Sequence, residues 1–168
     1  MKKLSTASAL TAALLCAPLA SQAATETDTF QVLLNLQASC TIDQATDLDF
    51  GTQTEAAVNA GGVTSTSTVS VTCSTGTGYD IGLSGTNGSR AMTSANSSSV
   101  SYELYQDVGN STDWDNTSVV SETGSSAQQD FTVYGLIPAQ TATINAGDNI
   151  DGDTGIDLSD TVTVTVTF

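Results

Sequence analysis

The sequence predicts an all-β fold, and three observations lead to this prediction. Apolar residues recur at every second position in short stretches of residues 24–168. Gly, Asn, Asp and Ser separate these stretches and supply turns. No window of this part of the chain shows convincing helical periodicity. Six to eight short strands at this spacing are typical of a β-sandwich, in one domain of ordinary size.

Before the first strand, residues 1–23 have the features of a secretory signal peptide. Two lysines precede an apolar stretch from about residue 7 to residue 20, and small residues favour cleavage after Ala23. The apolar stretch is too short to anchor the chain in a membrane. Cys16 lies inside this segment, and the leucine before it is not the small residue expected next to a lipidated cysteine. We therefore expect export and cleavage rather than a lipoprotein.

The first half of the remaining chain contains four alternating stretches. In 30–42 the even positions are apolar, and in 48–50 two apolar residues flank an aspartate. The stretches 69–73 and 79–83 each place three apolar side chains on one face. Each of the four is therefore expected to be a half-buried strand.

The second half contains four more. The stretch 100–105 alternates through Val, Tyr and Leu, 131–137 is apolar and aromatic, and 141–144 is short. The last stretch, 160–168, alternates Thr with Val and ends in Phe168. Turn signals between the strands include Asn87-Gly88 and a serine-rich run that follows the first half.

The strands at the two ends of the chain are unusual. The segment 30–36 is the most apolar alternating stretch, yet it follows the polar tail 24–29. The strand 160–168 is apolar on one face, and we expect no later segment to cover its free edge. The apolar segment could pair with the free edge as an added strand. If it cannot reach that edge within one molecule, the pairing would form between two molecules.

Charge excludes two classes of partner. After the signal peptide the chain has eighteen acidic residues against one arginine, Arg90, which gives a net charge of −17. This charge repels nucleic acid and anionic lipid, so neither is an expected partner. We interpret the acids as a soluble, self-repelling extracellular surface rather than as a binding site.

Two cysteines, Cys40 and Cys73, remain after the signal peptide is removed. In an exported chain the expected state is a disulfide between them. Closing a loop of about 34 residues would stabilise the fold by roughly 4 kcal/mol on the chain-entropy model. We expect this role to be structural rather than reactive.

The ordered set of short motifs along the chain resembles the spore coat protein U domain, a family that includes major pilins of archaic chaperone-usher pili. The resemblance spans nearly all of residues 24–168. The matching residues are Cys40 to Ile42, Leu48 to Gly51, Val69 to Cys73, Tyr79 to Leu83, Arg90, Met92, Tyr102, Leu104, Tyr105, Asp107, Trp114, Tyr134, Gly135, Ile137 to Ala139, Ala146, Gly147 and Asp160 to Phe168.

The resemblance implies an incomplete immunoglobulin-like β-sandwich that a donor strand from another subunit completes. It implies a signal peptide over 1–23, a donor-strand extension over 24–37 and a pilin domain over 38–168. A periplasmic chaperone would first fill the groove, and at the outer-membrane usher the extension of the next subunit would replace it. The implied donor residues are Phe30, Val32, Leu34 and Leu36, and the implied acceptor strand carries Val162, Val164, Val166 and Phe168.

This chain departs from the family by an insertion at 148–159. Its oxygen-bearing side chains occupy positions 1, 3, 5, 9 and 12 of an EF-hand-like count, which makes calcium conceivable. However, Thr154 stands where that loop requires glycine, the last ligand would be Asp rather than Glu, and flanking helices are not expected. We therefore expect no metal and no cofactor. The weak calcium candidates are Asn149, Asp151, Asp153, Asp157 and Asp160.

Residues 24–168 contain neither His nor Lys, which removes the usual general base and Schiff-base amine. Asp113 and Asp115 flank Trp114 and could in principle act on a sugar, but close carboxylate pairs are expected by chance among eighteen acids. We therefore expect a protein that is not an enzyme.

The sequence thus favours a structural pilus subunit that polymerises by donor-strand exchange and supports adhesion and biofilm formation. Its expected partners are other copies of itself, a chaperone, an usher and tip or minor pilins, and its expected location is the cell surface. Two alternatives remain open. One is a receptor-binding tip subunit, and the other is a secreted coat protein whose own segment 30–36 fills its groove.

Overall fold

The computed structural model describes residues 24–148 and 155–168. The signal peptide expected over 1–23 lies outside the described residues, as do residues 149–154 of the insertion. Leu36–Phe168 forms one compact unit, and the chain up to Asn35 is a separate unit. In that separate unit residues 24–35 have no regular secondary structure.

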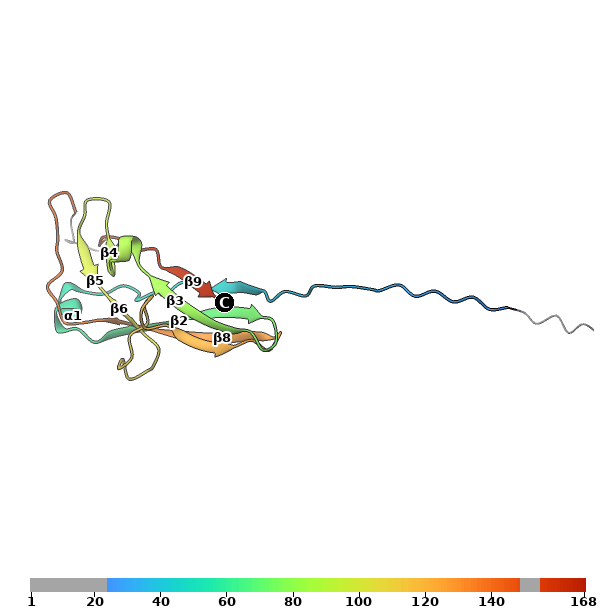
Figure 1. Ribbon diagram of the computed structural model, residues 1–168. Coiled ribbons are helices and arrows are strands. Elements are labelled where there is room, and N and C mark those ends of the chain that lie inside the picture. Colours follow the sequence, from blue (N-terminus) through green and yellow to red (C-terminus); the bar gives the residue numbers. More distant parts are fainter. Residues whose placement is uncertain (1–23, 149–154) are drawn as a thin grey trace, which may run out of the picture. The chain divides into compact units, whose positions relative to one another are not determined.

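The regular secondary structure of Leu36–Phe168 consists almost entirely of antiparallel strands, so the expected all-β fold is confirmed (Figure 1). One sheet has the strand order β1-β2-β8-β6: β1 (Cys40–Ala45), β2 (Val63–Cys73), β8 (Gln128–Ile137) and β6 (Glu103–Tyr105). The other has the order β7-β3-β9: β7 (Val120–Thr123), β3 (Gly78–Ser84) and β9 (Thr163–Thr167). A separate hairpin pairs β4 (Ala91–Thr93) with β5 (Ser99–Ser101).

The core lies between the two sheets because alternate residues of each face inward. In β2 the inward positions include Val69 and Val71, and in β3 they include Ile81 and Leu83, all nearly or completely buried. Trp114, from the loop after β6, packs into the same core with 1% of its surface exposed. A single apolar core thus joins both sheets into an immunoglobulin-like sandwich.

A disulfide joins Cys40 to Cys73, which confirms the pairing expected from the sequence. The two cysteines are direct partners in the register of β1 and β2. Cys73 is fully buried, and β1 has no other ladder partner among the described strands. The disulfide therefore fixes an edge strand of the sandwich to its neighbour.

The structure adds one short helix that the sequence pattern did not indicate, α1 (Glu55–Ala60). The Thr54 side chain accepts a hydrogen bond from the Ala57 N–H at its start, and Gly61 ends it with a φ of 72°. A 3₁₀ turn, η1 (Thr86–Gly88), follows β3. Neither α1 nor any other helix of the described ranges is long and apolar enough to cross a membrane.

Some expected strands differ from those observed. Only the last part of 30–42 is a strand, because residues before Cys40 have no ladder partner among the described residues. The stretch 48–50 is irregular, and within 141–144 only Thr143 forms a bridge, with Ser99. The terminal stretch forms β9 as expected, paired with β3.

Candidate functional site

A cavity of about 450 Å³ opens between one edge of each sheet. One wall comes from residues 45–50, which begin at the last residue of β1, and the other from residues 158–164, which run into the start of β9. Within the described residues β1 pairs only with β2, and β9 pairs only with β3. The cavity therefore lies between two strands that each have an unpaired edge.

The floor of the cavity is the apolar core itself. Val69 and Val133 line it from the four-stranded sheet, and Leu83 lines it from the three-stranded sheet. Leu104 of β6 also contributes. An occupant of the cavity would thus contact side chains of both sheets.

Side-chain hydrogen bonds hold the first wall in place of a regular ladder. The Ser67 hydroxyl donates to the Thr46 carbonyl, and the Thr68 N–H donates to Thr46 Oγ1 at 2.8 Å. Leu48 of this wall packs over Gly135, where an added Cβ would lie 2.7 Å from Leu48 Cδ1. Gly135 is therefore the residue that lets this wall approach the sheet closely.

The second wall is anchored at its beginning by β4. Thr93 and Ser159 form an isolated bridge, in which the Thr93 N–H donates to the Ser159 carbonyl at 2.8 Å and the Ser159 N–H returns a bond at 3.1 Å. Asp160 follows directly. Its carboxylate accepts hydrogen bonds from the Tyr102 hydroxyl at 2.6 Å, from the Thr161 N–H at 2.8 Å and from the Thr86 N–H at 3.2 Å.

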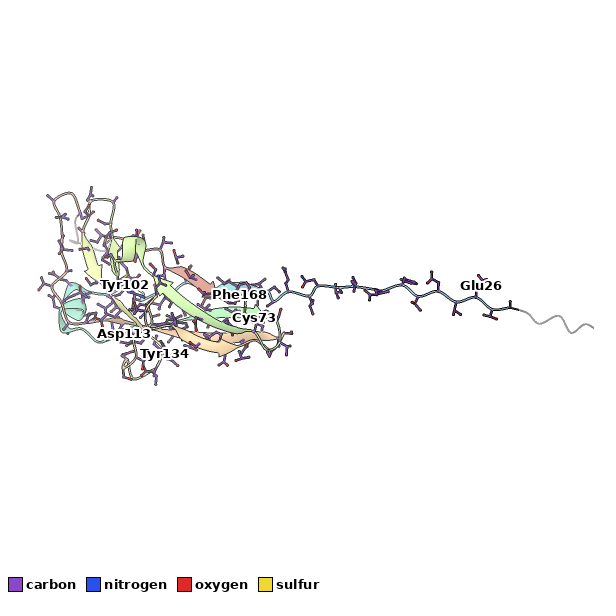
Figure 2. The ribbon with its side chains drawn as sticks, viewed as in Figure 1. Glu26, Cys73, Tyr102, Asp113, Tyr134 and Phe168 are labelled. Atoms are coloured by element: carbon purple, nitrogen blue, oxygen red, sulfur yellow. A yellow bond between two sulfur atoms is a disulfide. The ribbon has the colours of Figure 1, made fainter. Side chains whose placement is uncertain are left out.

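The hydrogen bonds around Asp160 change the pKa values of the groups that make them. Burial raises the pKa of the Asp160 carboxyl, but the hydrogen bonds from Thr86, Tyr102 and Thr161 outweigh it and hold that pKa below its ordinary value. Burial and the bond to Asp160 raise the pKa of Tyr102 well above its ordinary value. Asp160 is therefore charged and Tyr102 is protonated at neutral pH, so the cavity keeps a negative charge on its wall. Figure 2 labels Tyr102, whose hydroxyl binds Asp160 ahead of β9, and Phe168, which follows β9.

Arg90 and Trp114 complete the edge of β3 beyond β7. Arg90 Nη2 donates to the carbonyls of Leu83, at 3.1 Å, and Trp114, at 2.6 Å. Trp114 Nε1 donates to the Ile81 carbonyl at 2.9 Å. Arg90 Nη1 is buried and has no hydrogen-bond partner among the described residues. Burial lowers the pKa of Arg90, and Tyr102 and nearby carboxylates partly oppose that shift.

The expected acceptor residues lie in two different settings. Val162 and Val164 line the cavity and are half-buried against the core. Val166 is also half-buried against the core but lies outside the cavity, and Phe168 is 60% exposed. The structure thus gathers two of the four at the cavity.

The expected donor residues Phe30, Val32, Leu34 and Leu36 are 85–88% exposed. They belong to a stretch without regular secondary structure. Leu33, which breaks the alternation, is 83% exposed. These apolar side chains are unusual, because a soluble chain seldom exposes so many large apolar residues in a row.

Among the acidic candidates in the described part of the chain, Asp160 and Asp115 have other roles. Asn149, Asp151 and Asp153 lie outside the described residues, and the Asp160 oxygens accept the three bonds given above. Among the residues described, no group of three or more His, Cys, Asp or Glu is arranged to hold a metal ion. The carboxylate of Asp115 accepts from the N–H groups of Thr117 and Ser118, so it closes a turn.

Sequence reasoning missed the pairing of Tyr102 with Asp160 and the contribution of Asp47 to the wall. Tyr102 and Asp160 both belong to the motif set, but they are 58 residues apart, and no local pattern joins them. Asp47 lies two residues after the end of β1 and lines the cavity. Its position could be found from the sequence only by knowing where β1 ends.

Comparison with solved structures finds folds like this one. The first match is a chain in the crystal structure of the CsuC-CsuE chaperone-tip adhesion subunit pre-assembly complex from archaic chaperone-usher Csu pili of Acinetobacter baumannii, with a TM-score of 0.51 and 24% identity. The match covers 79% of this chain but only 40% of that one. The P pilus rod subunit PapA matches with a TM-score of 0.46 and 15% identity, over 76% of this chain and 99% of that one.

A search of curated proteins gave no match. The family model of the Spore Coat Protein U domain matches residues 26–165, which is most of the chain. This match includes both walls of the cavity and the exposed apolar segment. The chain therefore belongs to the Spore Coat Protein U domain family.

Proposed function

We propose that this protein is a structural subunit of an archaic chaperone-usher pilus, and that its cavity accepts segment 30–36 of a second copy as an added strand. One observation carries the proposal. The cavity opens onto the apolar core between two unpaired strand edges, and the same chain exposes an alternating apolar segment of the kind that such a cavity would take. Strand addition uses both features, since the ladder supplies affinity and alternate side chains supply specificity.

The energetic case rests on Phe30, Val32, Leu34 and Leu36. Each is almost fully exposed, so burial of all four would supply roughly 6 to 12 kcal/mol of apolar transfer, before the cost of ordering the segment. The added strand would also pair an edge that is a hazard for aggregation when it stays open. Head-to-tail insertion of this type does not close on itself, and it produces a fibre.

A subunit with an open cavity needs protection before it polymerises. The structural relative named above was captured as a pre-assembly complex of a chaperone with a tip adhesion subunit. We propose the corresponding sequence here, in which a chaperone fills the cavity during export and an outer-membrane usher exchanges it for the next subunit. Tip or minor pilins would complete a pilus at the cell surface, with adhesion and biofilm formation as its roles.

The proposal is tested by the size of the polymer formed after export. Full-length protein should form SDS-resistant ladders that collapse on heating. A chain without residues 24–36 should stay monomeric and should need a donor peptide or a chaperone to fill its cavity. A stable full-length monomer would refute the polymer and would instead favour a chain that fills its own cavity.

The face of the donor segment is tested by a matched pair of substitutions. Leu34→Asp would place a charge in an apolar cavity and should abolish the ladders, whereas Leu33→Asp, on the other face of an added strand, should leave them largely intact. Both residues are equally exposed in the free segment, so neither change should disturb the sandwich. If Leu33→Asp abolishes the ladders and Leu34→Asp does not, the register proposed for the buried face of the donor segment is wrong by one residue.

A further inference from the structure

Two carboxylates line the cavity, and the one cationic side chain near them, Arg90, does not line it. Asp47 and Asp160 both line it, and the hydrogen bonds to Asp160 hold that group in its charged form. The only cationic side chain of residues 24–168 is Arg90, whose Nη2 is bound to two backbone carbonyls. The whole chain from residue 38 onward has sixteen acidic residues and this one arginine, a net charge of −15.

The donor segment of the chain has the same sign of charge. Glu26 and Asp28 are its only charged side chains, and both precede the apolar residues that would enter the cavity. Two copies of this chain therefore approach each other with like charge on the donor and on the acceptor. Since Coulomb repulsion slows encounter and opposite charge accelerates it, the charge of a strand should decide how quickly it reaches the cavity.

We infer, on the basis of the proposed function, that the cavity selects its occupant by charge and favours a cationic strand from a second protein over the chain's own acidic segment. A strand fits the cavity if it has apolar side chains at alternate positions. Lysine or arginine beside these positions sets the rate at which the strand inserts. A cationic partner then occupies the cavity first, and self-insertion is slow. The preferred partner is thus a polypeptide strand with alternating apolar residues and flanking positive charge.

Three peptides of residues 24–37 test this inference: the natural sequence, Glu26→Gln with Asp28→Asn, and Glu26→Lys with Asp28→Lys. The acceptor is the full-length chain with Leu34→Asp, whose own donor segment is disabled. Association rates are measured by fluorescence anisotropy of the labelled peptides at about 10 mM and about 1 M salt, where the screening lengths are about 30 Å and 3 Å.

At low salt the lysine peptide should associate about tenfold faster than the natural peptide, and at high salt the two rates should agree within about twofold. Salt should accelerate the natural peptide, slow the lysine peptide and change the neutral peptide little. Equal rates for all three at low salt, or a faster natural peptide, would overturn charge selection while leaving strand insertion intact. Failure of all three to bind at either salt concentration would instead refute the proposed function.

Substitutions in the acceptor separate the charge of the cavity from the charge of the whole protein. Asp47→Asn removes a carboxylate from the wall, and Asp113→Asn removes one that does not line the cavity. Neither carboxylate accepts a hydrogen bond from the described residues, so both variants should fold normally. The difference between the lysine and natural peptides should shrink clearly more with Asp47→Asn. Equal effects of the two substitutions would overturn the assignment to the cavity.

Discussion

Replacing both cysteines of the disulfide with serine tests how β1, at the edge of the cavity, is held in the sandwich. In the Cys40→Ser, Cys73→Ser chain, β1 keeps its ladder with β2 but loses the covalent link at the first pair of that ladder. The link joins residues 33 positions apart, and removing such a cross-link frees the unfolded chain by about 4 kcal/mol. That is a large part of the stability of an ordinary domain.

Trp114 supplies the assay, because it is the only tryptophan and is 1% exposed in the folded state. Its fluorescence should report unfolding in urea, and with a slope of about 2 kcal/mol per molar the midpoint should fall by about 2 M. The natural chain in reductant should show the same midpoint as the double variant. A midpoint lowered by less than about 0.5 M at unchanged slope would refute the reasoning that this link restricts the unfolded chain.

Three further changes probe the walls of the cavity and the segments beside them. Tyr102→Phe removes the hydroxyl that donates to Asp160 and should cost about 2 kcal/mol in urea unfolding; an unchanged midpoint would contradict that bond. Hydrogen bonds from Ser and Asn side chains lower the pKa of Asp148, so the charged carboxylate stabilises the fold above pH about 4, and this stabilisation is lost as the pH falls through the folded pKa. Asp148→Asn should therefore reduce the loss of folding stability between pH 6 and pH 3. An identical loss in the variant and the natural chain would argue against this role of Asp148. Gly61→Ala, where a Cβ would lie 2.2 Å from a backbone nitrogen, should cost about 3 kcal/mol or more, whereas Gly62→Ala, with a similar φ but open space, should cost about 1 to 2; equal thermal shifts would contradict this packing.

The strands with inward alternation could be predicted well from the sequence. In β3, β8, β9 and residues 69–73 of β2, alternate side chains, most of them apolar, face one core, and this periodicity is visible in the chain. The first half of β2 was not predicted, because Ser65 and Ser67 occupy its inward positions. The helix α1 gave no such signal, since six residues are too few for helical periodicity. Its capping residues, Thr54 and Gly61, were the available sign.

The segment 30–39 shows that a local alternating pattern does not by itself predict a strand. Its even positions are apolar, as in β9, although Leu33 breaks the alternation. A strand also needs a ladder partner, and among the described residues β9 has one in β3 while 30–39 has none. The cavity was equally hidden, because it depends on where 45–50 and 158–164 meet in space. The disulfide was predictable, since the number of cysteines left a single pair.

Arg90 also bears on how the folded protein meets proteases. Enzymes of tryptic specificity cleave after Lys or Arg, and residues 24–168 offer them this one position. There the guanidinium binds two carbonyls of the sandwich, and the following residue, Ala91, begins β4. Cleavage therefore requires this part of the fold to open first, so its rate follows the population of the opened state when reclosing is fast. A surface built from carboxylates and hydroxyls, with its one arginine bound in this way, gives such enzymes little to cut.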